Sequence, residues 1–131
     1  MLKVERIDHG VRTLESRELT ERLAREGMAL TVCPLSNIKL RVFDVMGSHN
    51  LRQLLDAGLA ATVNSDDPAY FGGYMNDNFI AAFEALPLDA GHARQLARNS
   101  FAASFLDPER KRAFLAEVDE FFAKASPAAA A

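Results

Sequence analysis

The sequence predicts an α/β fold built on a parallel sheet, and three observations support this prediction. Strand-like segments begin at Val4, Ala29 and Leu59, and they alternate with segments of helical periodicity. Their starts lie about 25 to 30 residues apart, which is the length of a strand–helix unit. Residues 29–33 and 59–63 are continuous apolar runs, as expected for parallel strands that are buried on both faces. Strands joined by helices in this way form a parallel sheet with right-handed crossovers.

Helix signals occupy the intervals between the predicted strands. The first predicted helix carries Leu19 and Leu23 one turn apart and ends at Gly27. The second is predicted to begin with Ser48 as its N-cap and to end before Gly58.

The chain from residue 76 onward is predicted to be helical. Asp107 and Pro108 are typical of the N-cap and first residue of a last helix. Six phenylalanines are interpreted as core residues: Phe79, Phe83, Phe101, Phe105, Phe121 and Phe122. Residues 126–131 are rich in alanine, and we expect them to form a disordered tail. With no linker or repeat, residues 1–131 are predicted to form a single domain.

Composition and charge narrow the function classes. Hydrophobic residues make up 49% and charged residues 25% of the chain, a balance typical of soluble globular domains. The net charge of −3 and the lack of a basic stripe argue against a nucleic-acid partner. No apolar run is long enough to predict a membrane segment, and the first residues do not resemble a secretory signal. Cys33 is the single cysteine, so no internal disulfide can form and a cytoplasmic location is expected.

Polar residues follow each predicted strand at its carboxyl end. His9 follows the first strand, Ser36 and Asn37 follow the second, and Asp66 and Asp67 follow the third. In parallel α/β folds the active site lies at this edge of the sheet. We therefore expect His9, Ser36, Asp66 and Asp67 to lie together there.

Three strands do not close a barrel. A (β/α)₈ barrel takes about 250 residues, roughly twice the length of this chain. An open sheet of three parallel strands leaves two edges unpaired. A complementary N-terminal segment or self-association is expected to cover them, and on pattern alone a small three-layer α/β domain is the alternative.

Four motifs carry a resemblance to a known family. They are residues 6–12 (RIDHGVR), 31–37 (TVCPLSN), 63–71 (VNSDDPAYF) and 98–105 (RNSFAASF). In this order and spacing they resemble the adenosine/adenine deaminase family of metal-dependent hydrolases. The resemblance spans nearly the whole chain, and it implies the last three βα units of a TIM barrel followed by C-terminal helices.

Within that family the chain is most similar to the adenine deaminases. Asp8 stands before His9, where adenosine deaminases tend to carry glycine, and residues 66–73 (DDPAYFGG) also resemble the adenine-specific members. The chain departs from the family pattern because it lacks the first-strand His-x-His pair and the fifth-strand histidine with its following glutamate. In the family these residues supply three zinc ligands and a proton donor.

The resemblance also implies site roles and a cofactor. The cofactor is one zinc ion, which lowers the pKa of a bound water towards neutrality. The residue matching Asp66 is a zinc ligand and accepts a hydrogen bond from the attacking oxygen. The residue matching Asp67 binds the purine, and the residue matching His9 acts as a base or as an electrostatic partner.

The implied function is conversion of adenine to hypoxanthine and ammonia, with this chain inactive alone. Adenosine deamination, or a non-catalytic domain with vestigial site residues, are the alternatives.

Several of these residues also have plain structural interpretations. An Asp-Asp-Pro sequence is often a turn or helix cap. Cys33 has the chemistry of a soft zinc ligand, although the resemblance makes it a buried core residue. Ser36 and Asn37 either line the pocket or make loop hydrogen bonds. His49 and His92 are expected to be solvated at helix starts.

Overall fold

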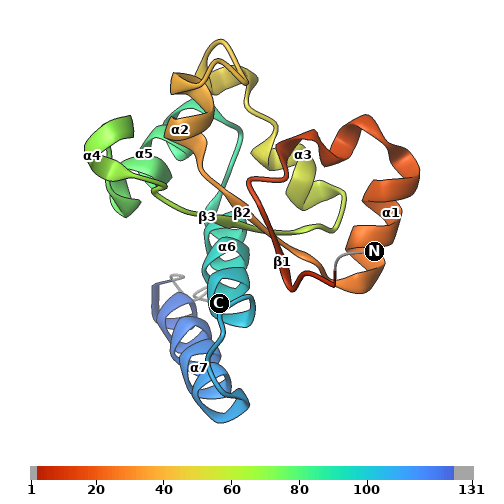
Figure 1. Ribbon diagram of the computed structural model, residues 1–131. Coiled ribbons are helices and arrows are strands. Elements are labelled where there is room, and N and C mark those ends of the chain that lie inside the picture. Colours follow the sequence, from red (N-terminus) through yellow and green to blue (C-terminus); the bar gives the residue numbers. More distant parts are fainter. Residues whose placement is uncertain (1–2, 126–131) are drawn as a thin grey trace, which may run out of the picture.

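A parallel sheet of three strands organises residues 3–125, which are the residues that the computed structural model describes. The strands are β1 (Arg6–Asp8), β2 (Ala29–Val32) and β3 (Ala60–Val63), and they lie in chain order (Figure 1). Ile7 pairs with Leu30, and Leu30 pairs with Ala61. The parallel sheet confirms the fold class predicted from the alternating pattern.

The helix that follows β1 is the one expected from its leucines and its terminal glycine. After the short 3₁₀ helix η1 (Val11–Glu15), α1 (Arg17–Glu26) begins at Ser16, whose side chain accepts a hydrogen bond from the Leu19 amide. It ends at Gly27, which has the left-handed φ of 63° that only glycine adopts without strain.

Beyond β2 the structure differs from the prediction in two places. Helix α2 (Pro34–Lys39) begins directly after Cys33, in a segment for which no helix is predicted from the sequence. The predicted N-cap Ser48 is wrong: Ser48 ends the 3₁₀ helix η2 (Met46–Ser48), and Asn50 precedes α3 (Leu51–Asp56). The helix starts later because its first buried leucine, Leu51, packs in the core immediately after the turn.

Four helices follow β3: α4 (Pro68–Phe71), α5 (Met75–Ala85), α6 (Ala90–Ala102) and α7 (Pro108–Ala125). Helix α6 packs against β3, and α7 packs along α6 and extends away from the sheet (Figure 1). Asn99 of α6 donates a hydrogen bond to the Ala61 carbonyl over 2.8 Å. The predicted start of α7 is confirmed, because the Asp107 carboxylate accepts from the amides of Glu109 and Arg110.

The first turn of α6 corrects one expectation. His92 is not solvated: its side chain is 14% exposed and forms a reciprocal capping pair with Asp89. This pair satisfies two backbone amides that the helix itself leaves unpaired.

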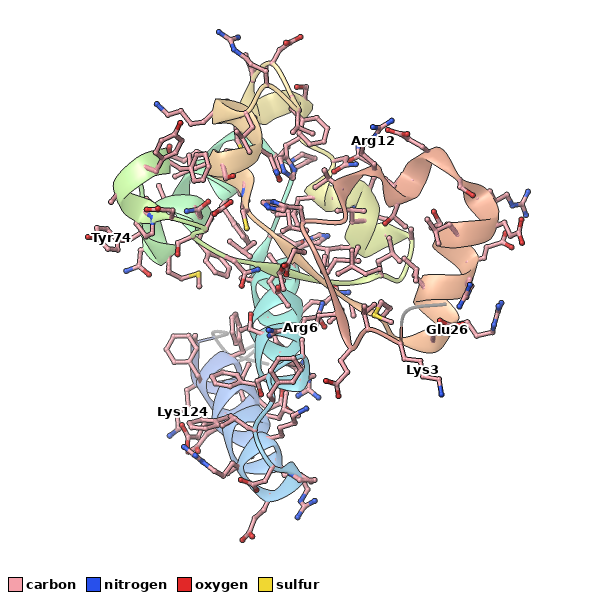
Figure 2. The ribbon with its side chains drawn as sticks, viewed as in Figure 1. Lys3, Arg6, Arg12, Glu26, Tyr74 and Lys124 are labelled. Atoms are coloured by element: carbon pink, nitrogen blue, oxygen red, sulfur yellow. The ribbon has the colours of Figure 1, made fainter. Side chains whose placement is uncertain are left out.

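The core lies between the sheet and the surrounding helices. Its fully buried aliphatic members are Leu30, Val32, Leu51, Leu54, Leu59, Ala61, Val63, Ala82 and Leu96. Of the six phenylalanines predicted to be core residues, Phe79 and Phe83 pack against it. Phe101 and Phe122 are half-buried outside it, and Phe105 and Phe121 are 68% and 64% exposed. Phe121 lies on α7, which packs along α6, and Phe105 lies in the connection between these two helices. Arg6 of β1 reaches towards the C-terminal helices (Figure 2), with its guanidinium carbon 4.0 Å from the Phe105 ring centroid.

The two outer strands each have one paired edge. Within residues 3–125, β1 and β3 pair only with β2. The expected tail at residues 126–131 lies outside the described residues. No described helix is both long and apolar enough to cross a membrane.

Candidate active site

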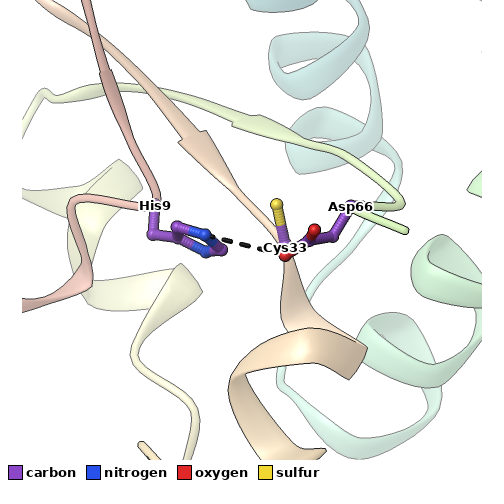
Figure 3. Close-up of side chains that lie close together, drawn as sticks. All are labelled: His9, Cys33 and Asp66. Carbon is purple, nitrogen blue, oxygen red and sulfur yellow. Dashed lines mark ion pairs between the residues drawn. The ribbon is translucent and has the colours of Figure 1, made fainter. Parts of the chain in front are cut away.

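The carboxyl ends of β1 and β3 bring a histidine and an aspartate face to face. His9 follows β1 directly, and Asp66 lies three residues beyond the last residue of β3. The His9 Nε2 atom is 3.6 Å from Asp66 Oδ2 (Figure 3). Their side chains are 36% and 26% exposed, so the pair lies at the surface of a cavity and remains accessible. The predicted meeting of these two residues is confirmed; their catalytic roles remain predictions.

Both residues have an unusual backbone. Among the described residues, the non-glycine positions with positive φ are His9 at 57°, Arg41 at 58° and Asp66 at 57°. A left-handed conformation is unfavourable for a side-chain-bearing residue, and such positions concentrate at functional sites. The strain is held in place by hydrogen bonds: the His9 amide donates to the Thr31 carbonyl over 3.0 Å, and Asp66 Oδ1 accepts from the Asp67 amide over 2.9 Å.

A series of buried hydrogen bonds connects His9, on the side of its ring away from Asp66, to the backbone of α3. Asn37 Nδ2 lies 3.2 Å from His9 Nδ1, and Asn37 Oδ1 lies 3.1 Å from His49 Nε2. His49 Nδ1 accepts in turn from the Leu51 amide over 3.0 Å. Asn37 and His49 are 2% and 1% exposed, so the expectation of a solvated His49 is wrong. Both interpretations left open for Asn37 apply, because it makes buried hydrogen bonds and also lines a cavity beside His9.

Burial sets the protonation state of His49. Removal from water disfavours the charged imidazolium and lowers the pKa of His49 from 6.5 to about 4. His49 is therefore neutral near pH 7. Nothing in the local sequence distinguishes this histidine from a surface one, because its burial comes from Phe43, whose ring centroid lies 4.5 Å away, and from the core packing of α3.

Cys33 lies beside the pair (Figure 3) and is buried, as the resemblance implied. Its thiol donates to the Thr31 carbonyl over 3.3 Å. Burial, together with the nearby Asp66 and Asp8 carboxylates, raises the pKa of Cys33 to about 11. The thiolate is the form that binds metal, and in the metal-free chain Cys33 is a neutral thiol near pH 7.

Three of the described residues form a candidate ligand set for a zinc ion. His9, Cys33 and Asp66 each offer a ligand atom, and these atoms lie within 4.8 Å of one another. The Asp66 carboxylate fits a zinc ligand, because its Oδ2 faces the cavity while Oδ1 is fixed by the Asp67 amide. With Cys33 held as a neutral thiol, the described residues fit only part of a zinc site, since a catalytic zinc takes about three protein ligands.

An open cavity of about 410 Å³ lies against these residues. Its walls include Asp8, His9, Thr31, Asn64 and Asp66. The Asp8 carboxylate is held in place by the Thr31 hydroxyl, which donates to it over 2.9 Å. The cavity thus combines a histidine with two carboxylates at the carboxyl edge of the sheet.

The other two residues predicted at this edge of the sheet, Asp67 and Ser36, occupy positions that also have structural explanations. Asp67 is the N-cap of α4, where its Oδ1 accepts from the Tyr70 amide over 3.1 Å. This is the helix-cap interpretation of Asp-Asp-Pro, and its substrate role remains a prediction. Ser36 is fully buried in α2, and its hydroxyl has no hydrogen-bond partner among the described residues.

Comparison with known proteins identifies the family. The chain matches the adenosine deaminase family model over residues 1–121. It is 60% identical to an adenine deaminase of Cupriavidus taiwanensis, with 99% of this chain and 38% of that protein covered. It is 63% identical to an adenine deaminase of Hahella chejuensis, with 92% and 36% covered.

Two solved structures show the same arrangement of elements. The adenine deaminase from Arthrobacter aurescens superimposes with a TM-score of 0.87 at 47% identity, covering 90% of this chain and 36% of that one. An amidohydrolase from Burkholderia ambifaria with bound Zn superimposes with a TM-score of 0.83 at 26% identity, covering 92% and 34%.

These proteins are much longer than the chain, which spans between a third and two fifths of their length. The predicted fold, three βα units of a TIM barrel followed by C-terminal helices, is confirmed by the superposition. The chain belongs to the adenosine deaminase family of metal-dependent hydrolases.

Proposed function

We propose that this chain is the C-terminal part of a zinc-dependent adenine deaminase, which acts in the cytoplasm and hydrolyses adenine to hypoxanthine and ammonia. The observation that carries this proposal is the facing pair of His9 and Asp66, 3.6 Å apart at the carboxyl edge of the sheet. The relatives named adenine deaminases, at 60% and 63% identity, support the choice of reaction.

In this proposal Asp66 is a zinc ligand. Zinc, when bound, supplies Lewis acidity that makes a water molecule nucleophilic near neutral pH. Asp66 would hold the ion and accept a hydrogen bond or proton from the water, and His9 would hold the same water through Nε2. The two side chains thereby fix the oxygen in one position relative to the purine ring.

Asp67 is proposed to bind the purine. One carboxylate oxygen caps α4, and the other would accept a hydrogen bond from the imidazole N–H of the base. The cap orients the carboxylate before substrate arrives, which lowers the entropy lost on binding.

The cavity favours the free base over the nucleoside. Asp8 lines it and is fixed by Thr31, so its carboxylate occupies space that a glycine would leave open. A charged group in the wall also disfavours a neutral ribose unless the sugar hydroxyls hydrogen-bond to it. We therefore propose adenine as the substrate, with adenosine as the alternative.

The chain alone is proposed to be inactive. Asp66 is one ligand, and a catalytic zinc needs about three from the protein. The unpaired edges of β1 and β3 fit the same proposal, because a complementary N-terminal segment would both cover these edges and bring the remaining ligands.

A chimaera tests the proposal. This chain replaces the corresponding segment of the Cupriavidus taiwanensis enzyme, with which it shares 60% identity. Ammonia release is measured with adenine and with adenosine, and the isolated chain serves as the control. Preferential turnover of adenine by the chimaera alone supports the proposal. Preference for adenosine would favour the alternative substrate, and a folded, zinc-loaded chimaera without activity would favour a non-catalytic domain.

A further inference from the structure

The hydrogen-bonded chain behind His9 has a direction that can be worked out from its far end. A backbone N–H can only donate, so the Leu51 amide requires a lone pair on His49 Nδ1. A neutral imidazole carries one proton, which must then be on His49 Nε2. This proton faces Asn37 Oδ1 over 3.1 Å.

The orientation of the Asn37 amide follows. With its oxygen accepting from His49, its nitrogen faces His9 Nδ1 over 3.2 Å and donates to it. The flipped amide would set an N–H group against His49 Nε2. This would require lone pairs on both nitrogens of His49, which a neutral imidazole does not have.

The same reasoning reaches His9. Because Nδ1 accepts from Asn37, the proton of neutral His9 lies on Nε2, which is the nitrogen facing Asp66. The opposite tautomer would set the Nδ1–H of His9 against the N–H of Asn37, so that two donors would face each other.

We propose that Asn37 and His49 are positioning residues that fix His9 as its Nε2–H tautomer, so that His9 presents a hydrogen-bond donor to Asp66 and the cavity. The catalytic meaning of this inference rests on the proposed function. It assigns His9 the role of electrostatic partner in the resting state, because a base or a metal ligand needs the Nε2 lone pair that this tautomer lacks.

The surroundings make such an arrangement stable. Asn37 and His49 are 2% and 1% exposed, so water does not compete for their hydrogen bonds. The Phe43 ring packs against His49 with centroids 4.5 Å apart and limits its rotation. Burial keeps His49 neutral near pH 7, so both of its nitrogens retain these roles.

Nuclear magnetic resonance on the isotopically labelled chain tests the inference without any activity assay. Two N–H···N hydrogen bonds are predicted, from the Leu51 amide to His49 Nδ1 and from Asn37 Nδ2 to His9 Nδ1. Each should give a nitrogen–nitrogen coupling across the hydrogen bond, and the histidine nitrogen shifts should place both protons on Nε2. A folded chain in which His9 carries its proton on Nδ1 would overturn the inference.

Two pairs of variants separate positioning from simple structural support. In Asn37→Asp an acceptor replaces the donor that faces His9, so a proton should appear on His9 Nδ1. The control is Asn76→Asp, at an exposed position in the first turn of α5, which should leave the His9 proton on Nε2. His49→Gln retains an N–H for Asn37 and should keep the Asn37–His9 coupling, whereas His49→Phe should lose it. If Asn37→Asp does not fold, the wild-type couplings and the His49 pair still decide. Equal couplings in His49→Gln and His49→Phe would refute the proposed relay.

These outcomes are independent of the proposed reaction. If the chimaera is inactive while the couplings are observed, the deaminase assignment fails and the relay stands. If the chimaera deaminates adenine while His9 carries its proton on Nδ1, the relay fails and the deaminase assignment stands.

Discussion

Acidification is expected to destabilise the chain through His49. The pKa of this residue is about 4 in the folded chain and 6.5 when the side chain is free in water, so below pH 6.5 the unfolded state binds the proton more readily. Stability is therefore complete above pH 6.5 and is lost progressively as the pH falls towards 4. At about 1.4 kcal/mol per pH unit, the loss reaches about 2 kcal/mol at pH 5 and about 3 kcal/mol by pH 4. Against a typical folding free energy of about 5 to 15 kcal/mol, this is readily measured.

The assay is urea unfolding followed by far-ultraviolet circular dichroism at pH 7 and pH 5. The His49→Gln variant is the control, because it removes the titrating group and keeps an N–H that can donate to Asn37. Other titrating groups, including His9, His92 and the carboxylates, are present in both chains and cancel when the two pH differences are subtracted. The wild-type chain should lose about 2 kcal/mol more than the variant between the two pH values.

One result would refute the reasoning. If the wild-type chain and His49→Gln lose the same stability between pH 7 and pH 5, then His49 is not held neutral by burial. A greater loss in the variant would mean that His49 is protonated and stabilising in the folded state, the reverse of the expected sign.

Three further predictions concern the site and its supporting backbone. In the active chimaera, Asp66→Asn should abolish deamination, while Asp67→Asn should lower kcat/KM by about 10- to 100-fold, equivalent to a lost charged hydrogen bond of about 1.5 to 3 kcal/mol; a larger loss with Asp67→Asn would mean that the two roles are reversed. The isolated chain should retain no stoichiometric zinc after dialysis, as measured by elemental analysis, whereas one tightly held zinc per chain would mean that the ligand set has been misread. Gly10→Ala should destabilise the chain by about 1 to 3 kcal/mol more than Gly72→Ala in urea unfolding. Both glycines have positive φ, but only a Cβ at Gly10 would meet a side chain, 2.7 Å from Leu30 Cδ2.

Much of the fold follows from local pattern. The apolar runs at residues 29–33 and 59–63 contain β2 and β3, because strands buried on both faces need apolar residues at successive positions. The terminal glycine of α1 and the Asp-Pro start of α7 are equally local signals. Helix α2 was missed because its single turn and a half is too short for a period to show.

The errors arose where burial depends on distant packing. Phe105 and Phe121 are large apolar residues of the kind that fill cores, yet both remain exposed. They lie just before and on α7, which packs along α6 and extends away from the sheet. His49 is the converse case, because this polar residue is buried against the Phe43 ring and hydrogen-bonded to Asn37 and the Leu51 amide. Neither outcome can be inferred from the neighbouring sequence, since both depend on which elements meet in space.

The site itself was predictable in position and only partly in geometry. Parallel strands place their carboxyl ends at one edge, which is why His9 and Asp66 could be expected to meet. Their left-handed backbone could not be foreseen, because His and Asp adopt positive φ at only a minority of their positions and so indicate it much less strongly than glycine does.

That backbone nevertheless bears on function. Glycine adopts φ near 57° without a Cβ penalty, so folding alone would favour glycine at positions 9 and 66. The chain instead carries a histidine and an aspartate there, and it holds each of them with a hydrogen bond from or to the adjoining backbone. Of the three described non-glycine residues with positive φ, the third being Arg41, these are the two whose side chains face each other across the cavity. The unfavourable backbone conformation therefore occurs at the two positions whose side chains meet in the cavity. This coincidence favours a chemical role for the pair over a purely structural one.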